Sequence, residues 1–124
     1  MNKIWFWFIA ILCMGAVAYA DERIIINSAD WRDVYSTMLY GSLTGKSVSF
    51  LVSSKHSASV LNAIPRETEI KAFTSRKNPF VVGYKSVLDN EGFTAEETLF
   101  ENLNFDFANQ LEVVNFVIVD DSYG

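Results

Sequence analysis

The chain has 124 residues, with 15 acidic side chains, 10 basic side chains and a formal net charge of −5. A chain of this length holds one domain with a core of its own. An acidic excess without a lysine or arginine cluster argues against a nucleic-acid-binding protein, because such proteins neutralise phosphates with basic side chains.

Residues 1–20 have the pattern of a signal peptide. Lys3 supplies a positive start, an apolar run follows, and Ala18-Tyr19-Ala20 places small residues where signal peptidase requires them. An uncleaved membrane anchor is the alternative, since about 17 apolar residues is the lower limit for crossing a bilayer. Both interpretations place the folded part outside the cytoplasm, and membrane contact would come only through an uncleaved leader.

Cysteine occurs once, at Cys13, inside the leader. A disulfide scaffold, a thiolate metal site and a cysteine nucleophile are therefore excluded for residues 21–124. The bulky Ile11-Leu12 before this cysteine also argues against a lipid attachment site, where small residues are expected.

Short apolar strands alternate with amphipathic helices along the rest of the chain. The alternation predicts an α/β fold, a three-layer sandwich with a mostly parallel, Rossmann-like sheet of about five strands. The third strand alternates between apolar and polar residues, so we expect it nearer an edge of the sheet. The predicted strands span residues 23–27, 48–52, 69–73, 97–100 and 116–120, and the predicted helices span residues 30–43, 54–63, 78–91 and 106–113.

The segment Gly41-Ser42-Leu43-Thr44-Gly45-Lys46-Ser47 resembles a phosphate-binding loop. It has three residues between its glycines where that motif needs four. The predicted helix also precedes this segment, whereas phosphate binding needs a helix after it. We therefore interpret the segment as a helix end followed by a tight turn.

Five aromatic residues of the predicted helices could stack on a carbohydrate. Their helical spacing is more typical of side chains that pack on the sheet, which is the interpretation we adopt for most of them. These residues are Trp31, Tyr35, Tyr40, Phe80 and Tyr84.

Residues 120–124 follow the last predicted strand in the same manner as residues 27–31 follow the first. A helix follows the first strand, so we expect residues 21–124 to be a single α/β domain made of one repeat unit and the start of a second. Without a covering helix, the apolar segment Phe116-Val117-Ile118-Val119 would be exposed, and self-association is therefore expected.

Polar side chains lie at the predicted strand ends, where sheets of this class bind ligands. Asp30, Asp120 and Asp121 offer the oxygen ligands that a divalent cation prefers, and no other cofactor is indicated. Polar caps, which helix starts require, explain the same residues, and we favour this interpretation.

The segment from Ile24 to Val34 resembles the type-two cell-wall-binding repeat of secreted bacterial and archaeal surface proteins. The family has an apolar strand, then a serine, an aromatic residue and an aspartate that opens a helix, and Ser28, Trp31 and Asp33 stand at these places. The segment Phe50-Leu51-Val52-Ser53 lies where the family has a second short strand. The chain would be a divergent and truncated member of this family.

The resemblance implies a secreted, non-catalytic module at the cell surface or in the cell wall. Its partners would be cell-wall polymer or other surface-layer protein subunits. The ligand-binding residues that this implies are Ser28, Asp30, Trp31, Asp33, Ser53, Asp120 and Asp121.

Two alternatives remain open. The first is an extracytoplasmic metal-dependent hydrolase, or a small-ligand-binding domain of the doubly wound type, that uses Asp30, Asp120 and Asp121 with a metal ion. The second is a decaying reading frame without an independent function. The one histidine, His56, has no carboxylate beside it in the sequence, so we expect a surface imidazole rather than a catalytic base.

Overall fold

The computed structural model describes residues 21–111, in which four strands and four helices alternate. The predicted leader, the predicted strand at 116–120, and Asp120 and Asp121 lie outside the described residues. The strands are β1 (Glu22–Asn27), β2 (Ser47–Phe50), β3 (Glu69–Ser75) and β4 (Thr94–Phe100), and the helices are α2 (Trp31–Thr44), α3 (His56–Asn62), α4 (Tyr84–Asn90) and α5 (Leu103–Gln110).

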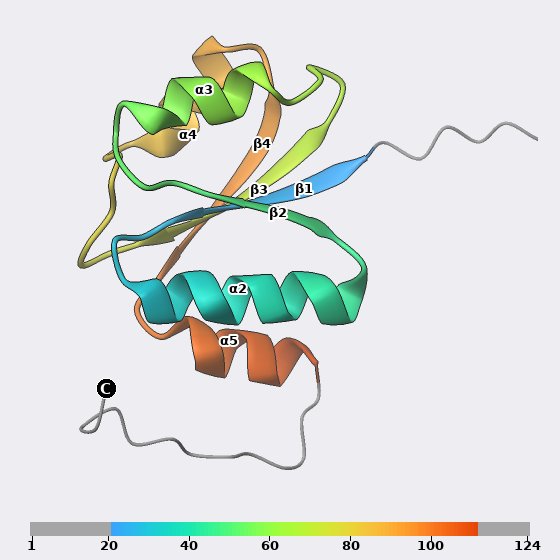
Figure 1. Cartoon of the computed structure of the whole chain (residues 1–124), viewed down its shortest axis with the longest axis vertical. Helices are drawn as coiled ribbons and strands as arrows, with labels where there is room; N and C mark the ends of the chain where they lie inside the picture. Colours follow the sequence, from blue (N-terminus) through green and yellow to red (C-terminus); the bar gives the residue numbers. More distant parts are fainter. Residues whose placement is uncertain (1–20, 112–124) are drawn as a thin grey trace, which may run out of the picture.

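The four strands form one parallel sheet in the order β2-β1-β3-β4. Helices α2 and α5 cover one face of this sheet, and α3 and α4 cover the other (Figure 1). The predicted α/β sandwich with a parallel sheet is therefore confirmed. No helix within residues 21–111 combines the length and the apolar character that crossing a membrane requires.

The three consecutive isoleucines of β1 explain why this strand lies inside the sheet. Successive side chains of a strand point to opposite faces. Ile24 and Ile26 pack with Phe73 and Phe107 on the side of α2 and α5, whereas Ile25 belongs to the core on the side of α3 and α4. A strand that is apolar on both faces is typical of a parallel sheet covered by helices on both sides.

The expectation that the third strand lies nearer an edge is wrong, because β3 pairs with β1 on one side and with β4 on the other. The polar residue responsible for its alternation is Lys71. Its ammonium group lies 3.5 Å from the Glu22 carboxylate, at the end of the sheet where the strands begin. A long side chain can thus be polar and still belong to an interior strand, since its charged end reaches solvent.

The third helix begins at Tyr84 and not at Asn78 as predicted. Residues 78–83 instead form a loop whose backbone is bound by the side chain of Asn27. Its Oδ1 accepts hydrogen bonds from the backbone N–H groups of Phe80 and Val81, at 2.9 and 3.1 Å. Asn27 also binds the backbone carbonyl oxygen of Val81, at 2.7 Å, so both kinds of backbone group in this loop are held by a side chain of β1.

The interpretation of residues 41–47 as a helix end and a tight turn is confirmed. Gly45 follows the last residue of α2 with φ at 70°, a left-handed conformation that glycine adopts without strain. The backbone N–H groups of Gly45 and Lys46 both donate to the carbonyl oxygen of Gly41. The chain thereby reverses direction and enters β2.

Tyr84 is completely buried, and its hydroxyl group has no hydrogen-bond partner within residues 21–111. We expect Tyr84→Phe to raise the free energy of unfolding by about 1 kcal/mol, because the variant keeps the ring and removes an unsatisfied buried hydroxyl. Urea unfolding at pH 7 measures this gain. Tyr35→Phe is the matched control, because Tyr35 is exposed and should show no change.

The advantage of Tyr84→Phe should grow in alkaline solution. Burial raises the pKa of Tyr84 to about 12, whereas an exposed tyrosine ionises near pH 10. Between these values the unfolded chain releases a proton that the folded chain keeps, so the wild type loses stability as the pH rises. Urea unfolding at pH 11 measures this difference. A Tyr84→Phe protein that is less stable than the wild type at both pH values would contradict this account.

Candidate functional site

The carboxyl ends of β1 and β3 lie side by side, and Asn27 joins them. Open α/β sheets usually bind ligands at this place, where the connections begin to run in opposite directions across the sheet. Asn27 is completely buried, and its Nδ2 donates to the Thr74 hydroxyl at 3.3 Å and to the Val81 carbonyl at 2.7 Å. The Thr74 hydroxyl in turn donates to the Glu97 carboxylate at 2.7 Å. The chain's own loop therefore occupies the usual ligand position.

The predicted site residues between β1 and α2 hold the start of that helix. The Ser28 hydroxyl donates to the Asp33 carboxylate at 2.5 Å and accepts from the backbone N–H of Asp30 at 3.1 Å. Asp30 caps α2 by accepting the backbone N–H of Arg32 at 3.0 Å, and it forms an ion pair with the Arg32 guanidinium at 2.9 Å. The structure thus brings Ser28, Asp30 and Asp33 together in one turn, in which Arg32 is the partner of the Asp30 carboxylate.

The two aspartates of this turn experience opposite electrostatic effects. Hydrogen bonds from Arg32 lower the pKa of the Asp30 carboxyl group. Burial is the largest effect on Asp33 and raises the pKa of its carboxyl group, although the Ser28 hydroxyl partly offsets it. Each of the two carboxylates has a partner within the turn, Asp30 with Arg32 and Asp33 with Ser28.

Ser53 lies beyond the end of β2, where its hydroxyl accepts the backbone N–H of His56 at 3.2 Å. It therefore helps to start α3. Within residues 21–111, no three side chains of the types His, Cys, Asp or Glu are grouped in a way that could hold a metal ion.

Among the predicted site residues within 21–111, Trp31 is the one that lies mainly at the surface, with 70% of its surface exposed. Tyr35, Leu39 and Leu43 follow it at intervals of four residues along α2, with 63%, 49% and 64% of their surfaces exposed. Residues four apart lie on one face of a helix. These four side chains form a single stripe on the outside of α2, which we call the α2 ridge.

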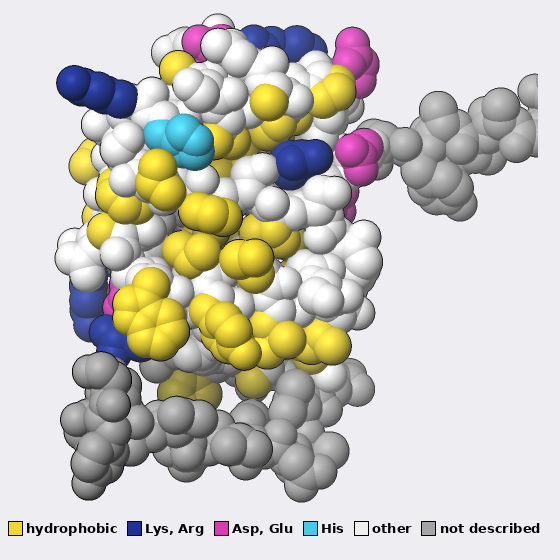
Figure 2. Space-filling view, viewed as in Figure 1, with side chains coloured by type: hydrophobic (Ala, Val, Ile, Leu, Met, Phe, Trp, Pro, Cys, Tyr) yellow, Lys and Arg dark blue, Asp and Glu magenta, His cyan; other side chains and the backbone are white. Residues whose placement is uncertain are grey.

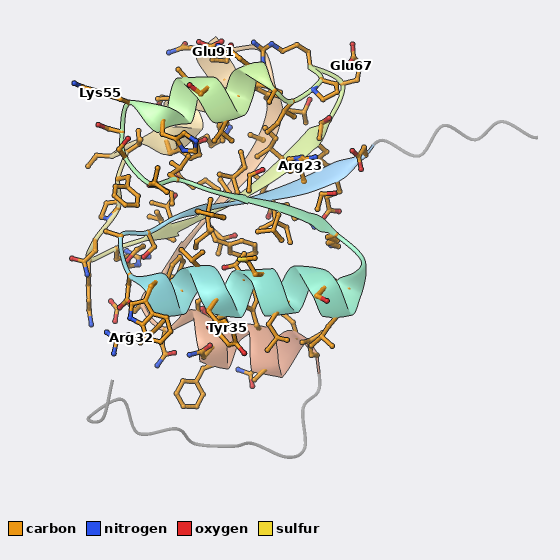
Figure 3. The ribbon with its side chains drawn as sticks, viewed as in Figure 1. Arg23, Arg32, Tyr35, Lys55, Glu67 and Glu91 are labelled. Atoms are coloured by element: carbon orange, nitrogen blue, oxygen red, sulfur yellow. The ribbon has the colours of Figure 1, made fainter. Side chains whose placement is uncertain are left out.

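The α2 ridge belongs to a wider apolar surface. Figure 2 shows hydrophobic side chains gathered along α2 and over β2 on this face of the molecule. Figure 3 shows Tyr35 projecting from α2 away from the sheet, on the same helix as Arg32. The stripe is thus a feature of the molecular surface, not of the core.

The expectation that aromatic residues of the helices pack on the sheet holds for three of the five. Tyr84 is buried, Phe80 packs against the core, and Tyr40 stacks on Phe107 with ring centroids 4.2 Å apart. Trp31 and Tyr35 are the two exceptions.

The opposite side of α2 explains the exception. The buried residues of this helix are Ser36, Thr37 and Gly41, which are small, and a Cβ atom on Gly41 would lie 2.3 Å from Val48 Cγ2. Small side chains let the helix approach the sheet closely. The helix therefore carries two stripes, a small one turned inward and a large apolar one turned outward. Ser36, Thr37 and Gly41 recur on one side of α2, and this pattern of small residues in the sequence could have shown which side of the helix faces the sheet.

A shallow hollow of about 150 Å³ lies at the opposite end of the sheet, and the sequence did not predict it. Lys46 and Lys71 line it, and both ammonium groups approach the Glu22 carboxylate, at 2.6 and 3.5 Å. The hydrogen bond from Lys46 is the main reason why the pKa of Glu22 is lowered. The two ammonium groups of this hollow are thus engaged with Glu22.

Comparisons of the chain with protein-family models, with curated proteins and with solved structures find no match. The function proposed below therefore rests on the sequence and on the geometry of residues 21–111.

Proposed function

We propose that the chain is an exported, non-catalytic cell-surface module that binds cell-wall polymer or assembles with other surface-layer subunits. The leader pattern of residues 1–20 supports export. Strand β1 begins at Glu22, so cleavage after Ala20 would leave every described strand and helix intact. The module contacts its partner through the α2 ridge, and the turn from Ser28 to Asp33 fixes the position at which the ridge begins.

The α2 ridge is the observation that carries this proposal. Soluble monomers rarely display contiguous apolar surface of this kind, and such surface commonly marks an interaction site. Tryptophan and tyrosine are also among the residues that contribute most to binding energy at protein interfaces. Trp31 and Tyr35 stand at the beginning of the ridge, one turn apart, with more than half of each side chain exposed.

The charge of the chain favours a protein subunit over an anionic polymer as the partner. A chain with a formal net charge of −5 repels an anionic polymer unless cations lie between them. The ridge itself consists of four apolar or aromatic side chains and needs no counter-ion. Burial of such a stripe against a second apolar surface would supply the binding energy.

Substitution of the two aromatic residues of the ridge should release the protein from the cell surface. We expect the full reading frame, expressed in a bacterium with a thick peptidoglycan wall, to be recovered in the wall fraction. Trp31→Ser combined with Tyr35→Ser should lower that recovery by about tenfold or more, because two residues of this kind commonly contribute about 2 kcal/mol each. Immunoblots of the wall, the medium and the cytoplasm measure the distribution.

Val82→Ser is the matched control, because Val82 is a large apolar residue that is 87% exposed and lies outside the ridge. This control should be distributed as the wild type is. Wall material stripped of its anionic polymer distinguishes the partners, since continued binding would exclude the polymer. An equal distribution of the double variant and the wild type, or retention of the wild type in the cytoplasm, would refute the proposal.

A further inference from the structure

Strand β2 forms one edge of the sheet in residues 21–111 and pairs with β1 on its inner side. The Leu51 N–H donates to the Ile26 carbonyl oxygen at 3.2 Å, on the side of β1. Successive residues of a strand direct their backbone groups to alternate sides, so those of Val48 and Phe50 are directed away from β1. Two N–H groups and two carbonyl oxygens are therefore offered in a row to another strand.

The side chains around this edge do not repel another strand. β2 has the sequence Ser47-Val48-Ser49-Phe50, without a charged residue. Phe50 and Met38 have 40% and 51% of their surfaces exposed, and Figure 2 shows hydrophobic side chains gathered over β2 and along α2. Proteins usually place charges on an exposed strand edge to prevent pairing with another chain. The edge of β2 lacks this protection.

The opposite edge of the same sheet is charged. Strand β4 carries Glu96 and Glu97 at its centre, and Glu96 is exposed. Antiparallel pairing of β4 with its own copy around this centre would bring carboxylates of two molecules together, and like charges across a strand pair are destabilising. Of the two edges of the sheet in residues 21–111, β2 is therefore the one that can pair with its own copy without repulsion.

Two antiparallel copies of β2 are complementary in one register, with Ser49 opposite Ser49 of the second copy. Val48 then lies opposite Phe50 of the second copy, and Phe50 lies opposite Val48. Because the backbone groups of Val48 and Phe50 point outward, each of these two pairs exchanges both of its N–H···O bonds. Apolar side chains meet apolar ones on the face of α2, and serine meets serine on the other face. The edge thus has the sequence of its own partner.

We propose that two copies of the chain associate through β2, antiparallel about a two-fold axis at Ser49. The product is one continuous sheet with four strands from each copy. A two-fold axis is the commonest symmetry of soluble oligomers. An axis perpendicular to the sheet keeps both α2 helices on one face of the dimer. The inference does not rest on the proposed function, because the strand pairing uses none of the four residues of the α2 ridge.

A disulfide between two copies tests the pairing and its register in the full-length chain with Cys13→Ser. Ser49→Cys, treated with oxidised glutathione, should give a disulfide-linked dimer, because the Cα atoms of this pair would lie about 4.5 Å apart. Ser47→Cys is the matched control. It lies on the same strand and is more exposed, but its copy would be about 13 Å away along the strand, so the dimer yield should be about tenfold lower. Equal yields, or no dimer from Ser49→Cys, would overturn the proposal.

A second substitution in the Ser49→Cys protein tests the apolar contacts. Phe50→Glu would place a carboxylate opposite Val48 at both ends of the paired strands, and the dimer yield should fall by about tenfold. Leu99→Glu is the matched control, because Leu99 is an exposed apolar residue of β4 and should leave the yield unchanged. Hydrogen exchange of the β3 amides, which lie inside the sheet, reports whether each variant remains folded. An undiminished dimer yield in folded Phe50→Glu would overturn the proposal.

Discussion

Replacement of Asn27 by alanine should lower the free energy of unfolding by about 3–5 kcal/mol. The side chain is completely buried and satisfies two backbone N–H groups and one backbone carbonyl of the loop at Phe80 and Val81. Each buried polar group left without a partner costs about 1–3 kcal/mol. The loss should be visible as a lower midpoint in urea and as a lower melting temperature.

A matched control separates this effect from the loss of an asparagine in general. Asn90 is exposed at the end of α4, and Asn90→Ala should change the stability by less than about 0.5 kcal/mol. The backbone amides of Phe80 and Val81 should also lose their protection from hydrogen exchange in Asn27→Ala. A stability loss below about 1 kcal/mol would show that the loop does not depend on Asn27.

The second large effect is expected for Gly41→Ala, which should destabilise the domain by about 2 kcal/mol. A Cβ atom at this position would lie 2.3 Å from Val48 Cγ2 and 3.0 Å from the Lys46 carbonyl oxygen. Overpacking of this kind costs about 1–3 kcal/mol. Alanine normally stabilises a helix by about 1 kcal/mol relative to glycine, so the sign of the change shows which effect dominates.

Two further variants make the Gly41 result specific. Ser42→Ala, at the exposed neighbouring position of the same helix, should be neutral or slightly stabilising. Gly41→Ala combined with Val48→Ala should be more stable than the sum of the single effects predicts, by about 1 kcal/mol, because the shorter side chain removes the clash. Additive effects, measured by thermal unfolding of the four proteins, would contradict the close contact between α2 and β2.

The parts of the fold that depend on local chemistry were predictable from the sequence. The isoleucines of β1 indicated a strand buried on both faces, Asp30 indicated the start of a helix, and Gly45 indicated its end. Each of these signals acts within a few residues. The order of the strands is different in kind, since it depends on contacts between segments that are far apart in the chain.

The start of α4 and the position of β3 were not predictable by the same means. Pro79 favours the first turn of a helix, but Asn27, more than fifty residues earlier, binds the backbone of the loop instead. Lys71 gave β3 an alternating pattern, although its ammonium group reaches Glu22 at the end of the sheet. In both cases a long-range contact of a polar side chain outweighed the local preference.

The candidate site was predicted in part. The family resemblance grouped Ser28, Asp30 and Asp33, and the structure brings them together in one turn. The sequence also indicated Asp30 as a helix cap, but it did not predict the hydrogen bond between Ser28 and Asp33. It expected most of the helical aromatic residues to face the core but could not say which, because the competing stripe of small residues on α2 was overlooked.

The buried amide of Asn27 has a consequence for how this domain can change. The 78–83 loop is hydrogen-bonded to Asn27 at the place where related architectures hold small molecules, so the polar atoms of Asn27 serve the fold. Under the proposed function, recognition by the α2 ridge would use a separate group of atoms. The exposed side chains of α2 can therefore be redesigned for a new target without changing the hydrogen bonds between Asn27 and the 78–83 loop.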